Sequence, residues 1–170
     1  MKKTFTVFLI ALTAVLLVVS FAACSVKITT DEIWNLATFK TGSGEKGRDV
    51  YIKVSRGGTV FYEYETKNGV EQEKQNPEEF EAPAFVLDGN VSLSLSGDYL
   101  ANEKTSYEDD ITTYTADIKN TKAVLNIDGA QNAKIIIKVN SKDKKLVSTQ
   151  IEYVTPSGNS VLVLVTPYYG

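Results

Sequence analysis

Ser160-Val-Leu-Val-Leu-Val-Thr166 is an unbroken apolar run close to the C-terminus. Such a run is typical of a central strand that is covered on both faces. The turn sequence Pro156-Ser-Gly-Asn159 comes directly before it, and residues 145–154 form a strand-like segment before that turn. A turn this short joins antiparallel neighbours, because parallel strands need a crossover of about a dozen residues or more.

The segment 145–154 also has the period of a half-buried strand. Successive side chains of a strand point to opposite faces. The alternation therefore predicts one face with Val147, Thr149, Ile151 and Tyr153 and another with Leu146, Ser148, Gln150 and Glu152.

Further strands are predicted upstream from runs of β-branched and aromatic residues bounded by turn residues. The predicted segments are 49–55, 58–66, 91–95, 110–118, 121–128 and 133–140. Arg56-Gly-Gly58 is interpreted as a hairpin turn. Residues 67–83 interrupt the pattern, with a short helical turn predicted at 76–79, and the polar residues 96–109 are interpreted as a loop.

A helix is predicted near the start of this region, over residues 31–40. Thr29 and Glu32 have the spacing of a capping box, in which each residue's side chain accepts a hydrogen bond from the other's backbone N–H. Ile33, Leu36 and Ala37 share one face of this helix, and Trp34 lies beside them. The pattern predicts a mainly β (α+β) domain, a curved antiparallel sheet or half-barrel with one short N-terminal helix. The alternative is a β-sandwich.

The N-terminus has the pattern of a secretion signal. Lys2 and Lys3 precede a mostly apolar stretch from residue 4 to 20, and Phe21-Ala-Ala-Cys24 follows. This ending resembles the lipobox of bacterial lipoproteins. The resemblance implies a signal peptide at 1–23, lipid on Cys24, a tether at 24–30 and a single antiparallel β domain at 31–170. An uncleaved membrane anchor and ordinary secretion are the alternatives.

Composition excludes several kinds of chemistry. The chain has no histidine, so the Ser-His-Asp arrangement and the commonest metal ligand are absent. Its only cysteine is the one assigned to the lipid. Without Lys2 and Lys3, the net charge is about −5, which gives no electrostatic reason to bind nucleic acid. Glu108-Asp-Asp110 is interpreted as a solvated loop rather than a Ca²⁺ site. We expect no enzyme, no cofactor and no metal.

One helix followed by a meander of strands, with a Lys-Leu-Val-Ser-Thr-Gln-Ile-Glu-Tyr strand (145–153) and a final apolar hairpin, resembles the lipoprotein-carrier type of half-barrel. The resemblance is topological and implies an apolar cavity that holds lipid. We expect a non-enzymatic lipoprotein on the extracytoplasmic face of the cell membrane, or on the outer membrane of a Gram-negative cell. Its lipid or other apolar ligand would lie between helix and sheet, near Ile33, Trp34 and Leu36. The alternative is a structural or protein-interaction module of the cell envelope with a solid core.

Overall fold

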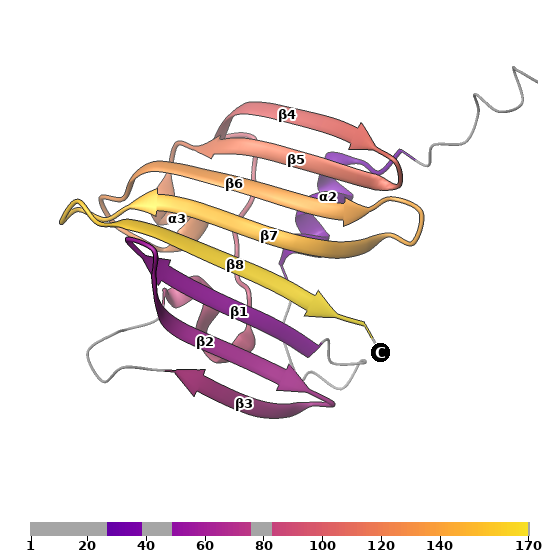
Figure 1. The fold of residues 1–170 in the computed structure, drawn as a ribbon. Coiled ribbons are helices and arrows are strands. Elements are labelled where there is room, and N and C mark those ends of the chain that lie inside the picture. The colour runs from indigo at the N-terminus through magenta and orange to yellow at the C-terminus, as the bar shows by residue number, and fades with distance from the viewer. Residues whose placement is uncertain (1–26, 39–48, 76–82, 170) are drawn as a thin grey trace, which may run out of the picture.

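The computed structural model describes residues 27–38, 49–75 and 83–169 (Figure 1). These residues form an eight-stranded antiparallel sheet with the strand order β3-β2-β1-β8-β7-β6-β5-β4. The strands are β1 (Asp49–Arg56), β2 (Thr59–Lys67), β3 (Val70–Gln75), β4 (Leu100–Glu108), β5 (Ile111–Ile118), β6 (Gln131–Asn140), β7 (Lys145–Val154) and β8 (Ser160–Tyr168).

Strand β8 lies in the interior of the sheet, as its sequence predicts. It pairs with β7, its neighbour in sequence, and with β1, which precedes it by more than a hundred residues in the chain. This second pairing joins two meanders, β1 to β3 and β4 to β8, into one open sheet whose edges are β3 and β4. The prediction of a mainly β fold with a curved antiparallel sheet is therefore confirmed. A single sheet is seen instead of the alternative sandwich.

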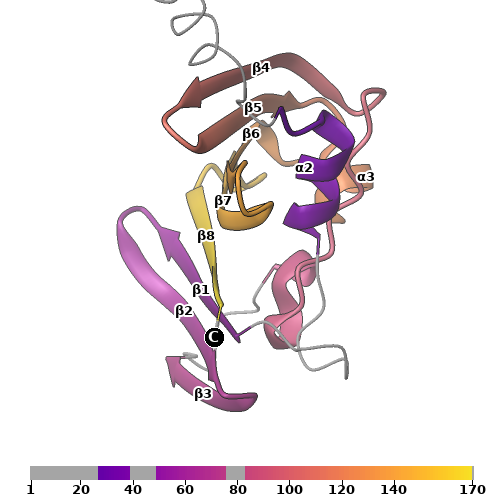
Figure 2. The same cartoon turned by 90° about the vertical axis from the view of Figure 1, so that its right-hand side faces the viewer.

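One face of the sheet is covered by α2 (Thr30–Ala37), the 3₁₀ helix η1 (Ala84–Gly89) and α3 (Thr121–Leu125), with the chain between η1 and β4 running among them (Figure 2). The buried apolar side chains of this layer and of the facing strands form one cluster. The opposite face carries no second layer within the described part of the chain. The expectation that β8 is covered on both faces is therefore wrong: Leu162 on the open face is 38% exposed, whereas Val163 is fully buried.

Helix α2 begins as predicted but ends earlier. The Thr29 side chain accepts a hydrogen bond from the Glu32 backbone, and the Glu32 side chain accepts one from the Thr29 backbone, which completes the capping box. The helix stops at Ala37 rather than at residue 40. Ile28, assigned to the tether by sequence, is only 4% exposed. Ile28 and Ile33 occupy the two positions of a hydrophobic staple, which explains why core packing already begins before the helix.

The predicted strand at 121–128 is wrong, because α3 occupies its first part. Asn120 caps this helix by accepting a hydrogen bond from the Ala123 backbone, and Asn126 ends it in the left-handed conformation with φ 56°. Thr121, Val124 and Leu125 are buried, at the spacing of one helix face. Short apolar runs fit either helix or strand, and here the two asparagine caps favour the helix.

The predicted strand at 91–95 is wrong, because the segment forms only an isolated bridge at Val91 and does not join the sheet. Val91 and Leu93 are buried and the serines between and after them are exposed, so the predicted alternation is correct. The backbone N–H of Ser92 donates to Phe85 O at 2.9 Å, and that of Ser94 donates to Val124 O at 3.3 Å. The segment therefore belongs to the covering layer.

The two edge strands were missed by sequence reasoning. β4 falls within the predicted loop 96–109, and β3 within the predicted interruption 67–83; the helical turn predicted at 76–79 lies outside the described residues. Almost every β4 residue after Leu100 is exposed, and Val70 at the start of β3 is 62% exposed. Edge strands of this kind lack the apolar alternation on which strand prediction depends.

The predicted faces of β7 hold except at one end. Lys138 on β6 pairs with Ser148 and the next residue, Val139, pairs with Leu146, so Val147 is an extra residue in β7. This β-bulge turns Leu146 toward the core, where it is 1% exposed, and leaves Val147 38% exposed. The prediction that Val147 shares a face with Thr149 is therefore wrong.

Candidate ligand-binding cleft beside α2

An open cleft of about 470 Å³ runs along the side of α2. Its volume lies within the range of about 300–1,000 Å³ that small-molecule sites usually have. Helix α2 and the chain after η1 form its two walls, which are lined by Asp31, Trp34, Asn35, Thr38, Leu93, Leu95 and Ser96.

The helical wall consists of residues that share one face of α2. Asp31, Trp34, Asn35 and Thr38 follow the spacing i, i+3, i+4, i+7, which places them along one side of the helix. Ile33 and Ala37 lie on another face, where they are 1% and 0% exposed. The same short helix therefore packs onto the sheet with one face and presents an aromatic ring among polar groups with another.

The Trp34 ring is held in place by Tyr114 of β5. The two ring centroids are 6.2 Å apart at an interplanar angle of 81°, an edge-to-face contact. The Tyr114 hydroxyl donates to Glu103 Oε2 at 2.7 Å, and burial, together with this hydrogen bond, raises the pKa of Tyr114 above its ordinary value. Because the indole Nε1 is buried, a ligand in the cleft meets the ring of Trp34 rather than its N–H group.

The second wall is held by hydrogen bonds that its backbone makes with side-chain hydroxyls and with other backbone groups. Thr38 Oγ1 donates to Leu93 O at 3.0 Å, which ties the end of α2 across to this wall. The carbonyl of Ser96 accepts from Tyr99 N at 2.9 Å, and its hydroxyl accepts from Asp98 N at 3.3 Å. Both walls are therefore formed before any ligand binds, which lowers the entropy cost of binding.

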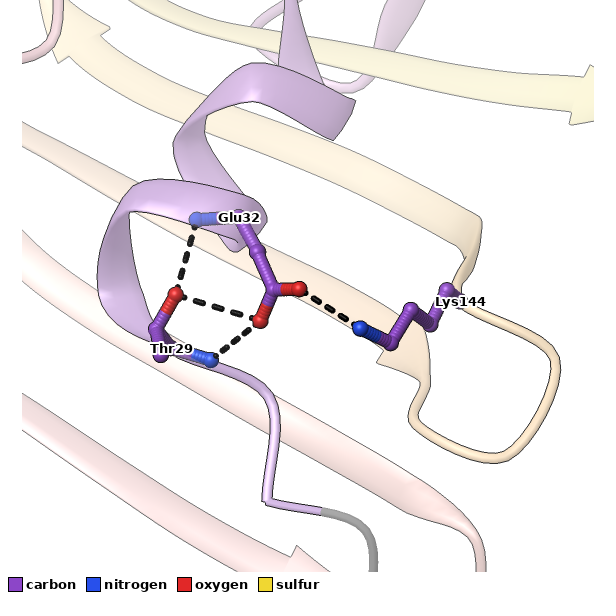
Figure 3. A network of polar contacts seen from close by, with 3 residues as sticks. All are labelled: Thr29, Glu32 and Lys144. Carbon is purple, nitrogen blue, oxygen red and sulfur yellow. Dashed lines mark hydrogen bonds and ion pairs between the residues drawn. The ribbon is translucent and has the colours of Figure 1, made fainter.

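The N-terminal end of α2 is attached to the sheet by a polar network (Figure 3). Lys144, in the turn between β6 and β7, donates to Glu32 Oε1 at 2.7 Å, and Thr29 donates to Glu32 Oε2 through its backbone N–H at 2.9 Å. The hydrogen bond from Lys144, followed by those from Thr29, lowers the pKa of Glu32 to about 2. This network lies outside the cleft and sets the position of the helix that forms its wall.

Charge in the cleft has one sign. Among the lining residues that the structure describes, Asp31 is the only ionisable one and none is a lysine or an arginine. The remaining groups are an amide, two hydroxyls, two leucine side chains and the indole. The described lining therefore combines some apolar surface with a few hydrogen-bonding groups, and none of its side chains is a cationic partner for an anionic ligand.

The three residues predicted to bind ligand lie in different places. Trp34 lines the cleft, Ile33 is buried against the rest of the core, and Leu36 packs partly buried against the core without lining the cleft. Sequence reasoning missed Asp31, Asn35, Thr38 and the whole second wall. The spacing of Asp31, Trp34, Asn35 and Thr38 is the signal that identifies the helical wall.

Other predicted sites are placed as follows. Cys24, the predicted site of lipid attachment, lies outside the described residues. Glu108, Asp109 and Asp110 lie at the turn between β4 and β5, where Asp110 O accepts from Ser141 N at 2.8 Å.

Across residues 27–38, 49–75 and 83–169, no three His, Cys, Asp or Glu side chains are grouped to hold a metal ion. In the same ranges, no helix is long and apolar enough to cross a bilayer.

The described residues form an open antiparallel sheet, and the layer of helices on one of its faces holds a cleft of about the size of a small ligand. No protein-family model, curated protein or solved structure matches the chain.

Proposed function

We propose that this protein is a non-enzymatic lipoprotein that binds a lipid or another apolar or amphipathic ligand beside α2. The observation that carries the proposal is the cleft of about 470 Å³, whose lining includes the partly buried Trp34 and Leu95 and the 6% exposed Leu93. Binding would remove apolar surface of the ligand and of these side chains from water, which is favourable by about 25 cal/mol for each Å² buried. Polar groups at the rim, such as Asn35, would orient the ligand.

The proposed location rests on the N-terminal sequence. Two or three acyl chains on Cys24 would hold the protein stably, since stable anchoring takes more than one chain. The domain would then stand on the extracytoplasmic face of the membrane, or on the outer membrane in a Gram-negative cell. A ligand taken from that space reaches the cleft without crossing a membrane.

A second candidate function is that of a structural or protein-interaction module of the cell envelope. It is favoured by the packing under α2, where Ile33 and Ala37 are almost completely buried. It is also favoured by large apolar side chains on the surface, among them Leu162, Tyr168 and Tyr169. In this case a partner protein would contact the surface of the sheet, and the cleft would have no role.

Native mass spectrometry of residues 25–170, purified from a bacterial host, tests the first proposal. The sample is extracted in parallel to identify any small molecule that leaves with it. We expect a co-purifying ligand or uptake of an added amphiphile, lost in Trp34→Gln and retained in Leu36→Ala, a matched change on the same helix outside the cleft. A clean apo mass that takes up no added fatty acid, phospholipid or saccharide contradicts the proposal and favours the interaction module.

A further inference from the structure

We propose that the cleft beside α2 recognises a neutral, hydroxylated ring, such as a hexose unit of a polysaccharide. This inference rests on the proposed function and narrows its ligand class. It follows from three features of the cleft: the charge of its lining, the placement of hydrogen-bonding groups around Trp34, and its open shape.

The charge of the lining argues against anionic lipids. The head of a fatty acid or a phospholipid is negative and would be brought beside Asp31, and the described part of the lining holds no lysine or arginine to compensate. Like charges close together lower affinity. A neutral ligand avoids this penalty.

The groups around Trp34 fit the surface of a sugar. A hexose ring has C–H groups on its faces and hydroxyls around its rim, so one face can stack on an aromatic ring while the hydroxyls reach polar side chains. Asp31 and Asn35 lie one turn apart on α2, on either side of Trp34 along the helix, and both are exposed. Asp31 supplies acceptors only, whereas Asn35 supplies donors and an acceptor, and a hydroxyl can serve either.

The orientation of Trp34 makes its ring a fixed platform. Its edge-to-face contact with Tyr114 holds the indole before the ligand arrives. The two walls are likewise fixed by the hydrogen bond from Thr38 to Leu93. Because the cleft is open, one ring of a longer chain can enter while its neighbours extend into solvent.

The fluorescence of Trp34 gives a direct test, because it is the only tryptophan of the chain. The full chain, purified from bacterial membranes in a polyoxyethylene detergent, is titrated with maltotriose, cellotriose and N,N′,N″-triacetylchitotriose, and separately with oleate. We expect at least one saccharide to change the emission saturably and oleate to produce no saturable change. The variant Asn35→Ala should weaken saccharide binding by roughly tenfold, the effect of one lost hydrogen bond.

Two further variants make the result specific. Tyr168→Ala alters the sheet away from the cleft and should leave binding unchanged, with circular dichroism of each variant verifying its fold. Asp31→Asn removes the charge of the cleft but keeps its shape, so it should allow oleate to bind more tightly than it binds the natural protein.

The outcomes distinguish a failure of the saccharide inference from a failure of the proposed function. Saturable binding of oleate at Trp34 without any response to the saccharides overturns the inference and leaves the proposed function standing. Saccharide binding to the Trp34→Ala variant is measured by calorimetry, because this variant has no tryptophan. If neither Asn35→Ala nor Trp34→Ala weakens saccharide binding, the site lies elsewhere and the inference is also overturned. No response to any probe, together with a clean apo mass, contradicts both the inference and the proposed function.

Discussion

Lys144 Nζ lies 2.7 Å from Glu32 Oε1 and thereby joins the turn between β6 and β7 to the first turn of α2. The two residues are 112 positions apart in the chain. Glu32 also completes the capping box with Thr29, so one carboxylate both caps the helix and attaches it to the sheet. The position of Trp34, two residues further along the same helix, depends on this arrangement.

The first prediction concerns acid stability. The pKa of Glu32 is about 2 in the folded protein against an ordinary value of 4.5. A carboxylate with a lowered pKa contributes stability that is present above its unfolded pKa and is lost as the pH falls through the folded one. In Glu32→Gln, the free energy of unfolding should therefore fall less between about pH 4.5 and pH 2 than in the natural protein. Urea denaturation at a series of pH values measures this difference, which should be modest because the pair is exposed.

The reciprocal change controls for the cap. Lys144→Met removes the ion-pair partner of Glu32 but leaves the hydrogen bonds with Thr29. It should therefore weaken the pH dependence of the unfolding free energy less than Glu32→Gln does. Parallel curves for Glu32→Gln and the natural protein over that pH range would show that the carboxylate has no lowered pKa.

The bulge in β7 predicts a large loss of stability at Leu146 and almost none at the adjacent Val147. Leu146→Ala removes a core side chain and should lower the free energy of unfolding by about 2–5 kcal/mol. Val147→Ala shortens an exposed side chain and should change it by no more than about 0.5 kcal/mol. Chemical denaturation of the two variants side by side measures this difference. A larger effect for Val147→Ala would mean that β7 keeps a regular alternation without the bulge.

The caps of α3 predict a position-specific effect at Asn120. Asn120→Ala removes the acceptor of the Ala123 N–H and should cost about 1 kcal/mol in unfolding free energy. Asn120→Asp keeps an acceptor for this N–H group and should therefore retain most of the stability that Asn120→Ala loses. Thermal denaturation of the three proteins is the measurement, and equal losses in both variants would contradict the assigned cap.

Two tyrosines, in addition to Tyr114, should ionise at a pH above the ordinary range. Burial raises the pKa of Tyr153 to about 12, and burial together with the hydrogen bond to Glu63 raises that of Tyr51 to about 12. A raised pKa means that the associated stability is present below about pH 10 and is lost as the pH rises toward 12. In a titration of tyrosinate absorbance, Tyr51→Phe and Tyr153→Phe should each remove one late step. Loss of a step near pH 10 in either variant would contradict this environment.

The predictable parts of the fold are those that rest on local chemistry or on strong apolar runs. Thr29 and Glu32 identify the helix start, because a capping box requires only residues three apart. The run at 160–166 identifies an interior strand, although its open face, with Leu162, shows that such a run does not establish cover on both sides. β3 and β4 were not predictable in this way, since edge strands with polar side chains lack an apolar period.

The bulge and the cleft could not be derived from local pattern alone. Val147 continues the alternation of β7 in sequence, and only the pairing of Val139 with Leu146 reveals the extra residue. Trp34 was predictable as a candidate because it lies beside the apolar face of a helix. Its neighbours in the cleft include Leu93 and Leu95, whose approach to α2 depends on tertiary packing.

A ligand that binds in the cleft beside α2 should change the NMR signals of the residues around it. Backbone amide chemical shifts of the isotope-labelled protein are mapped while the polysaccharide and lipid fractions of a bacterial envelope are added separately. We expect the polysaccharide fraction to shift residues 31–38 and 93–96. Shifts confined to the open face of the sheet around Leu162 and Tyr168, with the cleft unchanged, would show that the ligand site lies elsewhere.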